Sequence, residues 1–223
     1  MGWRHIKQEG DSVRKKKHHT QTEFSKCLEA CDLSTVRSVL DWGPGSGWMS
    51  EMICENREVY FVDVSKEVLN KAISNIPHAH SLLINNNDSY RMIIKSLSKT
   101  DIDMIVAFSV IYHFPSFEYF EAIAECWKRI SPKYICIKTM ISRESTWEWP
   151  EYEKYAESNN YLRGLLLTEH DLLSNLQNYN IAVRETTDTV IPGKLGQVRN
   201  KIQLDGVPEY ESVIYTLKRK DIA

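Results

Sequence analysis

The segment Val39–Met49 reads VLDWGPGSGWM and constrains the fold more than any other part of the chain. A short apolar run leads into Asp41, and three evenly spaced glycines follow, namely Gly43, Gly45 and Gly47. Glycine lets a backbone adopt positive φ and approach a ligand closely. The helix that we expect from Trp48 to Glu55 would add free N–H groups and a partial positive charge at its start. The segment therefore predicts a strand, a glycine turn and a helix that hold a nucleotide-like ligand.

Two common phosphate-binding motifs do not fit this glycine turn. A dinucleotide fingerprint would need its third glycine at the position that Trp48 occupies. A P-loop would need Lys and then Ser or Thr after its last glycine, where the chain has Trp48-Met49. The turn therefore has to serve a different cofactor.

A second acidic residue narrows the choice of cofactor. Val59–Val62 is an apolar run that ends in Asp63, about 20 residues after the glycine turn. With Asp41 two residues before Gly43, the pattern resembles the class I methyltransferases that depend on S-adenosylmethionine (SAM), over roughly residues 36–140. In that family such an acid accepts hydrogen bonds from both ribose hydroxyls, which suits the two oxygens of a carboxylate. A plainer interpretation is that Asp63 only caps the helix that follows it.

Strands and helices alternate along the chain through Met140, which predicts a doubly wound α/β fold. The resemblance implies a mostly parallel seven-stranded sheet with helices on both faces and an antiparallel last strand. The predicted strands are Val36–Asp41, Val59–Asp63, Ser81–Ile84, Asp103–Ser109, Tyr134–Met140, Ile181–Val190 and Glu211–Leu217. The predicted helices are Thr20–Leu33, Trp48–Glu55, Lys66–Asn75, Tyr90–Leu97, Pro115–Ile130 and Thr168–Tyr179.

The length of 223 residues favours one structural domain. We expect residues 1–35 to form an N-terminal arm and helix that cover the site, and residues 36–223 to form the methyltransferase domain. Residues 142–162 break the alternation with many aromatic and acidic side chains, which predicts an insertion over the active site. The polar N-terminus and the lack of a long apolar run indicate a cytoplasmic protein without a membrane span.

The resemblance carries a set of cofactor-binding positions onto the ends of the predicted strands. SAM would be the methyl donor and S-adenosylhomocysteine (SAH) the product. The residues concerned are Asp41, Gly43, Pro44, Gly45, Gly47, Trp48, Asp63, Val64, Asn87, Asp88, Phe108 and Ser109. Asp88 matches best the acid that faces the adenine amino group, Asn87 matches next, and a simple helix cap is the alternative for both.

The segment after the fourth predicted strand, Ala107–Val110, restricts the methyl acceptor. Enzymes that methylate exocyclic amino groups of bases carry Asp/Asn-Pro-Pro-aromatic here, and this chain has no proline pair. Metal-dependent catechol-type enzymes use acidic ligands at this strand end, which Ala107 and Ser109 cannot replace. The five cysteines also lack the paired spacing of zinc sites. We therefore expect no metal and a pattern typical of small-molecule O- and N-methyltransferases.

His113 and Tyr112 are the candidate catalytic residues, since they follow the fourth strand where the acceptor pocket of the family begins. Histidine titrates near neutrality and can take a proton from a hydroxyl at cellular pH. Tyr112 would orient the acceptor or the sulfonium. The alternative for His113 is a structural hydrogen bond to the backbone of the strand-to-helix turn.

Four further residues are predicted to bind the acceptor. Trp147 and Trp149 would line or cover its site, although aromatic-rich segments also serve as partner surfaces or simple packing. Arg4 and Lys17 belong to a basic N-terminal stretch that could attract an anionic acceptor, and a solvated face is the alternative.

These residues predict a SAM-dependent methyltransferase that acts on a hydroxyl of a small molecule or glycan. The alternatives are an amine N-methyltransferase, an RNA methyltransferase and a SAM-binding module without turnover. The net charge of −2 gives no overall field that would attract nucleic acid. The sequence leaves the acceptor and the oligomeric state open.

Overall fold

The computed structural model describes residues 11–84, 97, 101–149, 164–190 and 207–222. The helices are α1 (Asp11–Glu29), η1 (Leu33–Thr35), α2 (Trp48–Glu51), α3 (Lys66–Asn75), η2 (Ile111–His113), α5 (Phe117–Ile130) and α7 (Glu169–Asn175), where η denotes a 3₁₀ turn. The strands are β1 (Ser38–Trp42), β2 (Glu58–Asp63), β3 (His80–Leu83), β4 (Met104–Phe108), β5 (Tyr134–Ser142), β6 (Trp147–Glu148), β7 (Leu165–Thr168), β8 (Tyr179–Val190) and β9 (Tyr210–Arg219).

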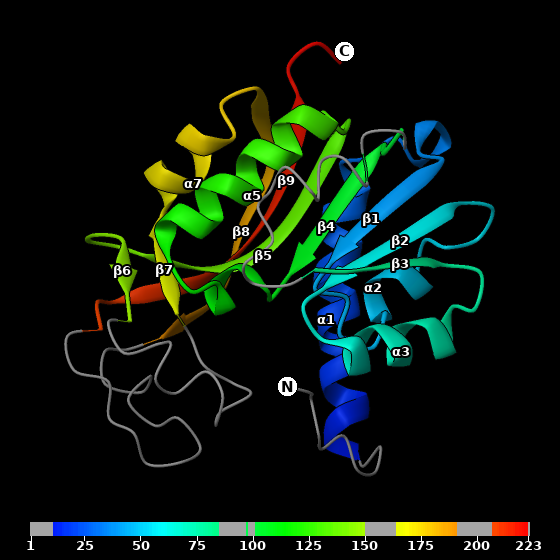
Figure 1. The fold of residues 1–223 in the computed structure, drawn as a ribbon. Helices are drawn as coiled ribbons and strands as arrows, with labels where there is room; N and C mark the ends of the chain where they lie inside the picture. Colours follow the sequence, from blue (N-terminus) through cyan, green and yellow to red (C-terminus); the bar gives the residue numbers. More distant parts are fainter. Residues whose placement is uncertain (1–10, 85–96, 98–100, 150–163, 191–206, 223) are drawn as a thin grey trace.

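The strands form one sheet in the order β3-β2-β1-β4-β5-β7-β6, with β9 antiparallel to β5 and β8 antiparallel to β9 (Figure 1). All pairs from β3 to β5 are parallel. The predicted α/β fold, with a mostly parallel sheet and an antiparallel last strand, is thus confirmed. The described residues contain two strands more than predicted, because β7 pairs with the end of β5 and β6 pairs with β7.

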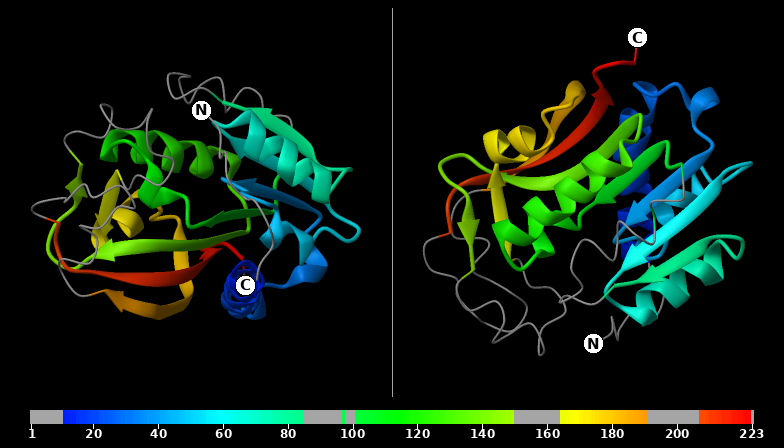
Figure 2. Two further views of the ribbon diagram at one scale, coloured as in Figure 1. Left: turned by 90° about the horizontal axis from the view of Figure 1, so that it is seen from below. Right: turned by 45° about the horizontal axis from the view of Figure 1, so that its top comes forward.

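Helices cover both faces of this sheet because successive side chains of a strand point to opposite sides. Leu40 and Ile105 pack in one core with α5 and α7. Val39 and Met104 pack in the other with α1 and α2, and Val59, the register partner of Val39, packs with α3 on that same side. In the left view of Figure 2, α5 lies above the sheet and α1, seen nearly end-on, lies below it.

The first helix begins earlier than predicted, at Asp11 instead of Thr20, and ends at Glu29. The hydroxyls of Thr20 and Thr22 donate to the carbonyls of Lys16 and His18 one turn back. Both threonines therefore lie inside the helix, and part of the segment predicted as a polar arm is helical.

The helix after the glycine turn is shorter than predicted and ends at Glu51 instead of Glu55. The guanidinium of Arg57 explains the early end. It donates hydrogen bonds of 3.0–3.2 Å to four backbone carbonyls, those of Leu33, Val36, Ile53 and Glu55. Two of these carbonyls belong to the segment that would have continued the helix, and Arg57 holds them in a compact turn instead.

Candidate cofactor and acceptor site

The glycine turn after β1 has the backbone conformation that its sequence requires. The φ angles are 70° at Gly43, 58° at Gly45 and 76° at Gly47, a region that residues with a Cβ atom rarely adopt. The Gly43 amide donates a 2.8 Å hydrogen bond to the Val62 carbonyl in β2. The turn therefore begins directly beside the carboxyl end of β2, where Asp63 lies.

The three glycines differ in what surrounds them. A Cβ atom at Gly43 would lie only 2.4 Å from Cγ2 of Val110, so the turn packs tightly on the segment after β4. A Cβ atom at Gly47 would make ordinary contacts with Phe61 and Ala72. A Cβ atom at Gly45 would meet no atom within 4 Å. The turn thus has open space at Gly45, where a ligand could approach the backbone.

Two carboxyl groups flank the turn. Asp41 in β1 is 2% exposed and accepts a 2.7 Å hydrogen bond from the Ser50 hydroxyl of α2. Burial raises the pKa of Asp41 to about 7 and the pKa of Asp63 to about 6. The cap of α3 is Ser65, whose hydroxyl accepts from the Val68 amide, so Asp63 is not the helix cap.

Asp63 has acceptor positions beyond those that the backbone uses. The Ser65 amide donates to Asp63 Oδ1 at 2.8 Å, and the Val64 amide also lowers the pKa of Asp63 against the effect of burial. A carboxylate offers about four lone-pair sites, so a diol can still bind. The next side chain, Val64, is apolar and 48% exposed.

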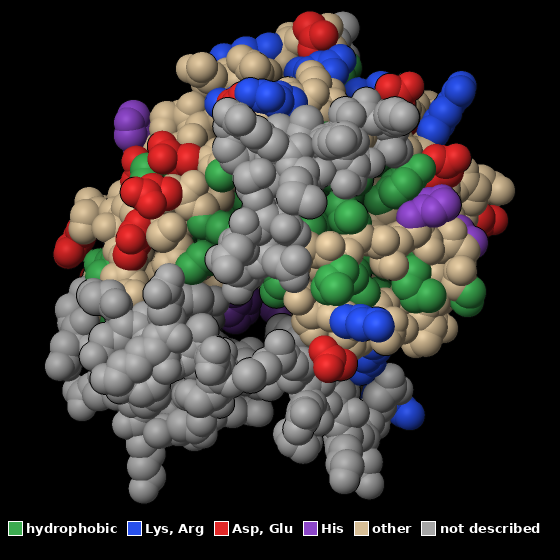
Figure 3. Space-filling model, viewed as in Figure 1, with side chains coloured by type: hydrophobic (Ala, Val, Ile, Leu, Met, Phe, Trp, Pro, Cys, Tyr) green, Lys and Arg blue, Asp and Glu red, His purple; other side chains and the backbone are tan. Residues whose placement is uncertain are grey.

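Apolar side chains gather at the surface near the carboxyl ends of β2 and β3. Leu83, the last residue of β3, is 46% exposed, which is unusual for leucine. Figure 3 shows hydrophobic side chains over β3 and α3 in this view. Asn87 and Asp88, the predicted adenine contacts, follow β3 but lie outside the described residues.

The carboxyl end of β4 is tightly constrained. Phe108 is buried and makes an edge-to-face contact with Phe24 of α1, with 5.1 Å between ring centroids. Ser109 has a φ of 61°, and its amide donates to the Lys138 carbonyl at 2.8 Å. A serine at positive φ carries backbone strain of the kind that clusters at functional sites. This strained residue directly precedes Val110, on which Gly43 packs.

Tyr112 and His113 lie in η2, just beyond this strained residue. Both are half-buried, and their rings are 4.4 Å apart with planes tilted by 53°. The His113 amide donates to the Val110 carbonyl at 2.9 Å, which fixes the turn. The structure therefore brings the predicted catalytic pair close in the fold to the glycine turn, through Val110.

The predicted acceptor residues Trp147 and Trp149 have different environments. Trp149 is only 6% exposed, and its amide donates to the Gly164 carbonyl, while the Gly164 amide donates to the Tyr112 carbonyl. Trp147 is half-buried in β6 and packs against Leu166 and Tyr210. A short backbone chain thus joins Trp149 to Tyr112, whereas Trp147 lies on the outer edge of the sheet.

The predicted basic residues are only partly described. Arg4 lies outside the described residues. Lys17 of α1 forms a 2.5 Å ion pair with Glu51 of α2 and is partly exposed. The Gln21 side chain also donates to the Trp48 carbonyl at 3.1 Å. These two contacts hold α1 beside the start of α2 and hence beside the glycine turn.

Two contacts that support the site were not predicted. The first is the hydrogen bond that the Ser50 hydroxyl donates to Asp41. The second is the ion pair between Lys138 of β5 and Glu23 of α1, and Glu23 is only 3% exposed. Lys138 is the residue whose carbonyl holds Ser109. Neither contact follows a local pattern, because each joins residues from separate elements.

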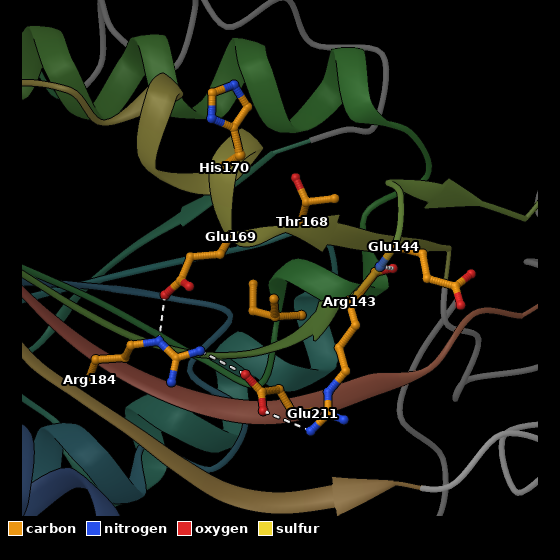
Figure 4. Close-up of a pocket in the computed structure, with 9 residues that line it drawn as sticks. Arg143, Glu144, Thr168, Glu169, His170, Arg184 and Glu211 are labelled. Carbon is orange, nitrogen blue, oxygen red and sulfur yellow. Dashed lines mark hydrogen bonds and ion pairs between the residues drawn. The ribbon is translucent and has the colours of Figure 1, made fainter.

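A cavity of about 500 Å³ lies at the carboxyl end of β5, beside the start of α7, and is lined by none of the predicted site residues. The guanidinium of Arg184 forms ion pairs with the carboxylates of Glu169 and Glu211, with N–O distances of 2.6 and 2.7 Å (Figure 4). The guanidinium of Arg143 pairs with Glu211 at 3.5 Å. These charges are paired with one another. The cavity therefore does not resemble the site that the strand ends build around the glycine turn.

In the described part of the chain, no group of three or more His, Cys, Asp or Glu side chains could hold a metal ion. Nor does any described helix combine the length and the apolar character needed to cross a bilayer.

Comparison with known proteins finds a family match for part of the chain. Residues 39–133 match the family described as methyltransferase domain. No curated protein matches the whole sequence significantly.

Several solved structures have the same fold. The N-methyltransferase NodS from Bradyrhizobium japonicum WM9 is 12% identical, with a TM-score of 0.55 over 95% of this chain and 99% of that one. Magnesium protoporphyrin IX methyltransferase (ChlM) from Synechocystis PCC 6803, solved with bound SAM, is 14% identical, with a TM-score of 0.59 over 97% of this chain and 89% of that one. The 1,6-didemethyltoxoflavin-N1-methyltransferase from Burkholderia thailandensis is 13% identical, with a TM-score of 0.57 over 96% of this chain and 83% of that one. At these identities the likeness shows the fold.

Proposed function

Because residues 39–133 match a methyltransferase domain and the fold is shared with a methyltransferase solved with bound SAM, we propose that this chain is a class I methyltransferase that uses SAM to methylate a hydroxyl group of a small molecule or glycan. The observation that carries the proposal is the position of His113. The glycine turn packs on Val110 through Gly43, and Val110 is the residue whose carbonyl fixes the His113 amide. A candidate base therefore lies next to the turn that we assign to the cofactor.

The residues around the glycine turn fit SAM. The open space at Gly45 allows a ligand to approach the backbone, with Pro44 inside the turn and Trp48 directly after it. Asp63 would hold the ribose hydroxyls, and the exposed Val64 would contact the adenine together with Asn87 or Asp88. Asp41, Gly43 and Gly47 would shape the cradle, and Phe108 and Ser109 would form its wall at the end of β4.

When bound, SAM would supply a methyl group from its positively charged sulfur. The acceptor oxygen would bond to the methyl carbon while the carbon–sulfur bond breaks. The protein then has to align the acceptor, remove its proton and exclude water. His113 would take the hydroxyl proton, and Tyr112, whose ring lies against it, would orient the acceptor. The strained turn at Ser109 would fix both residues relative to the cofactor.

The acceptor would bind between η2 and the segment around Trp149. Trp149 is buried and would support the wall behind Tyr112, while the half-buried Trp147 would contact a larger acceptor at the edge. Lys17 and Arg4 would attract an anionic group, and Lys17 would then have to exchange its partner Glu51 for the acceptor. We assign residues 1–35 to a cover of the site and residues 36–223 to the catalytic domain, within one structural domain.

An amine acceptor is the second candidate. Two of the proteins with similar structures, NodS and the toxoflavin enzyme, are N-methyltransferases. A neutral amine needs no base for attack, so His113 would then be structural. RNA methylation and SAM binding without turnover are further outcomes of the experiment below.

The test is transfer of isotope-labelled methyl from SAM into a metabolite extract, combined with calorimetric measurement of SAM binding. A labelled product whose methyl group is on oxygen supports the proposal. A product labelled on nitrogen would establish the amine reaction, and label in RNA alone would establish an RNA methyltransferase. Micromolar SAM binding without any labelled product would instead indicate a non-catalytic module.

A further inference from the structure

Four basic residues share one exposed side of α1. Arg14, Lys15, His18 and His19 are all exposed to solvent. Arg14 lies one helical turn from His18, and Lys15 lies one turn from His19, so the four side chains are neighbours on one face of the helix. We call this set the basic face of α1. Among the described residues, no acidic side chain forms an ion pair with Arg14, Lys15 or His18.

Two other lysines of the same helix have carboxylate partners. Lys17 pairs with Glu51 of α2 at 2.5 Å, and Lys26 pairs with Glu185 of β8. These two ion pairs fasten α1 to its neighbours in the fold. The basic face therefore carries positive charge that the packing of α1 does not use.

The basic face lies next to the carboxyl ends of β4 and β5. His19 Nε2 is 3.3 Å from Glu23 Oε1, and Glu23 pairs with Lys138 of β5. Lys138 is the register partner of Phe108, the last residue of β4. In Figure 1 the first turns of α1 project past this edge of the sheet. Ligands of open α/β sheets bind outside the carboxyl ends of the strands, so the basic face borders the proposed acceptor side.

A phosphate group matches the basic face better than a carboxylate does. A phosphate monoester carries a charge of about −1.5 to −2 at neutral pH and has three strong acceptor oxygens. A carboxylate carries one charge and has two oxygens. Side chains one helical turn apart have Cβ atoms about 5–6 Å apart, so two of them can reach the oxygens of one phosphate. Arginine and lysine are also the side chains that proteins use most to bind phosphate.

We propose that the basic face of α1 is a phosphate-binding site and that the methyl acceptor is a phosphorylated small molecule or glycan. The proposal rests on the proposed methyl transfer, because it names the acceptor class for the same site. Arg14, Lys15 and His18 bind the phosphate without giving up an ion pair, whereas Lys17 would first have to leave Glu51. The phosphate anchors one end of the acceptor and leaves its hydroxyl to approach the glycine turn.

The first test is transfer of labelled methyl from SAM into a metabolite extract, with and without prior treatment of the extract with alkaline phosphatase. The treatment should remove the labelled product. Lys15→Glu should lower transfer into the untreated extract roughly tenfold, while calorimetry shows unchanged SAM affinity. The matched control is Lys220→Glu, which reverses an exposed lysine after β9, at the other end of the molecule (Figure 1), and should transfer like the wild type.

The second test does not depend on turnover. Calorimetry with inorganic pyrophosphate should detect binding to the wild type, and added salt should weaken it. Lys15→Glu should weaken this binding roughly tenfold, and Lys220→Glu should leave it unchanged. Acetate at the same concentration should not compete with pyrophosphate.

Three results would overturn the proposal. They are equal pyrophosphate affinity of the wild type and Lys15→Glu, no pyrophosphate binding by either, and a labelled product that survives the phosphatase treatment. Label in RNA alone would assign the basic face to a polynucleotide instead of a small acceptor. If the wild type transfers no label at all, the proposed function fails, and the pyrophosphate measurement then decides by itself whether the basic face binds phosphate.

Discussion

The proposed cofactor side of the site is built mainly from one β1–α2–β2 unit, whereas the proposed acceptor side draws on β4, η2, β6 and the segment before β7. On the cofactor side, Asp41, the glycine turn and Asp63 are held by hydrogen bonds between neighbouring strands and their connection. On the acceptor side, backbone hydrogen bonds through Gly164 link Tyr112 to Trp149. Local geometry builds the first side, and long-range contacts build the second.

This difference predicts which property a variant on each side should change. Variants on the cofactor side should change SAM affinity or the stability of the free protein, because they alter a preformed backbone cradle. Variants on the acceptor side should change turnover and leave SAM binding intact. The predictions below test that separation, from the largest expected effect to the smallest.

His113→Ala should lower turnover by roughly 10²–10⁴-fold while SAM affinity barely changes, because the variant loses a proton acceptor and no cofactor contact. The wild-type rate should rise with pH through the histidine pKa, and the variant should lose that rise. Steady-state kinetics across pH and calorimetry measure both quantities. An active variant with the wild-type pH profile would return His113 to a structural role and favour an amine acceptor.

Asp41→Asn should change how stability depends on pH. The pKa of Asp41 is about 7 in the folded protein and 3.8 for an ordinary aspartate, so the folded state binds an extra proton between these values. The free energy of unfolding of the wild type should therefore fall as pH rises from about 4 to about 7, by up to about 4 kcal/mol from this group. Asn stays neutral and can still accept from Ser50, so the variant should be the more stable form at pH 8.

Urea unfolding of the SAM-free protein at several pH values measures this effect. Asp103→Asn is the matched control, since Lys133 and backbone amides outweigh burial there and lower the pKa of Asp103. Above a pH of about 4, Asp103→Asn should be less stable than the wild type, because the variant lacks the stabilising carboxylate. This effect is opposite in sign to that of Asp41→Asn. Identical pH dependences of the wild type and Asp41→Asn would contradict the assignment.

Asp63→Ala should weaken SAM binding by about 1–3 kcal/mol, because the ribose hydroxyls lose their charged acceptor. The wild type should also bind SAM less tightly below a pH of about 6, where Asp63 becomes protonated in the free protein. Calorimetric titration with SAM at pH 5 and pH 8 measures both effects. Unchanged SAM affinity in Asp63→Ala would remove Asp63 from the cofactor side.

Gly45→Ala and Gly47→Ala form a matched pair with the smallest expected stability effect. Both positions have positive φ, so each substitution should cost about 1–2 kcal/mol in folding. Only at Gly45 does the new methyl group enter open space in the turn, whereas at Gly47 it meets Phe61 and Ala72. SAM affinity should therefore drop at least roughly tenfold more for Gly45→Ala, and equal affinities of the two variants would place the cofactor elsewhere.

Most element positions could be predicted from the sequence because their signals are local. The apolar runs of β1, β2, β4 and β5 and the cap of α3 at Ser65 lie within one residue or two of their expected positions. One error came from a contact across the fold, because Arg57 ends α2 early by binding four carbonyls, two of them before β1. The other was the start of α1, which begins at Asp11 and has Thr20 and Thr22 in its interior.

The sequence by itself determined the glycine turn and the two acids beside it, because positive φ and the end of a parallel strand are properties of short segments. Only the tertiary structure decided that Gly45 faces open space while Gly43 is closed by Val110, and that Trp149 is buried while Trp147 is not. Such neighbours come from segments far apart in the chain, and their meeting depends on how helices pack on the sheet, which no local pattern encodes.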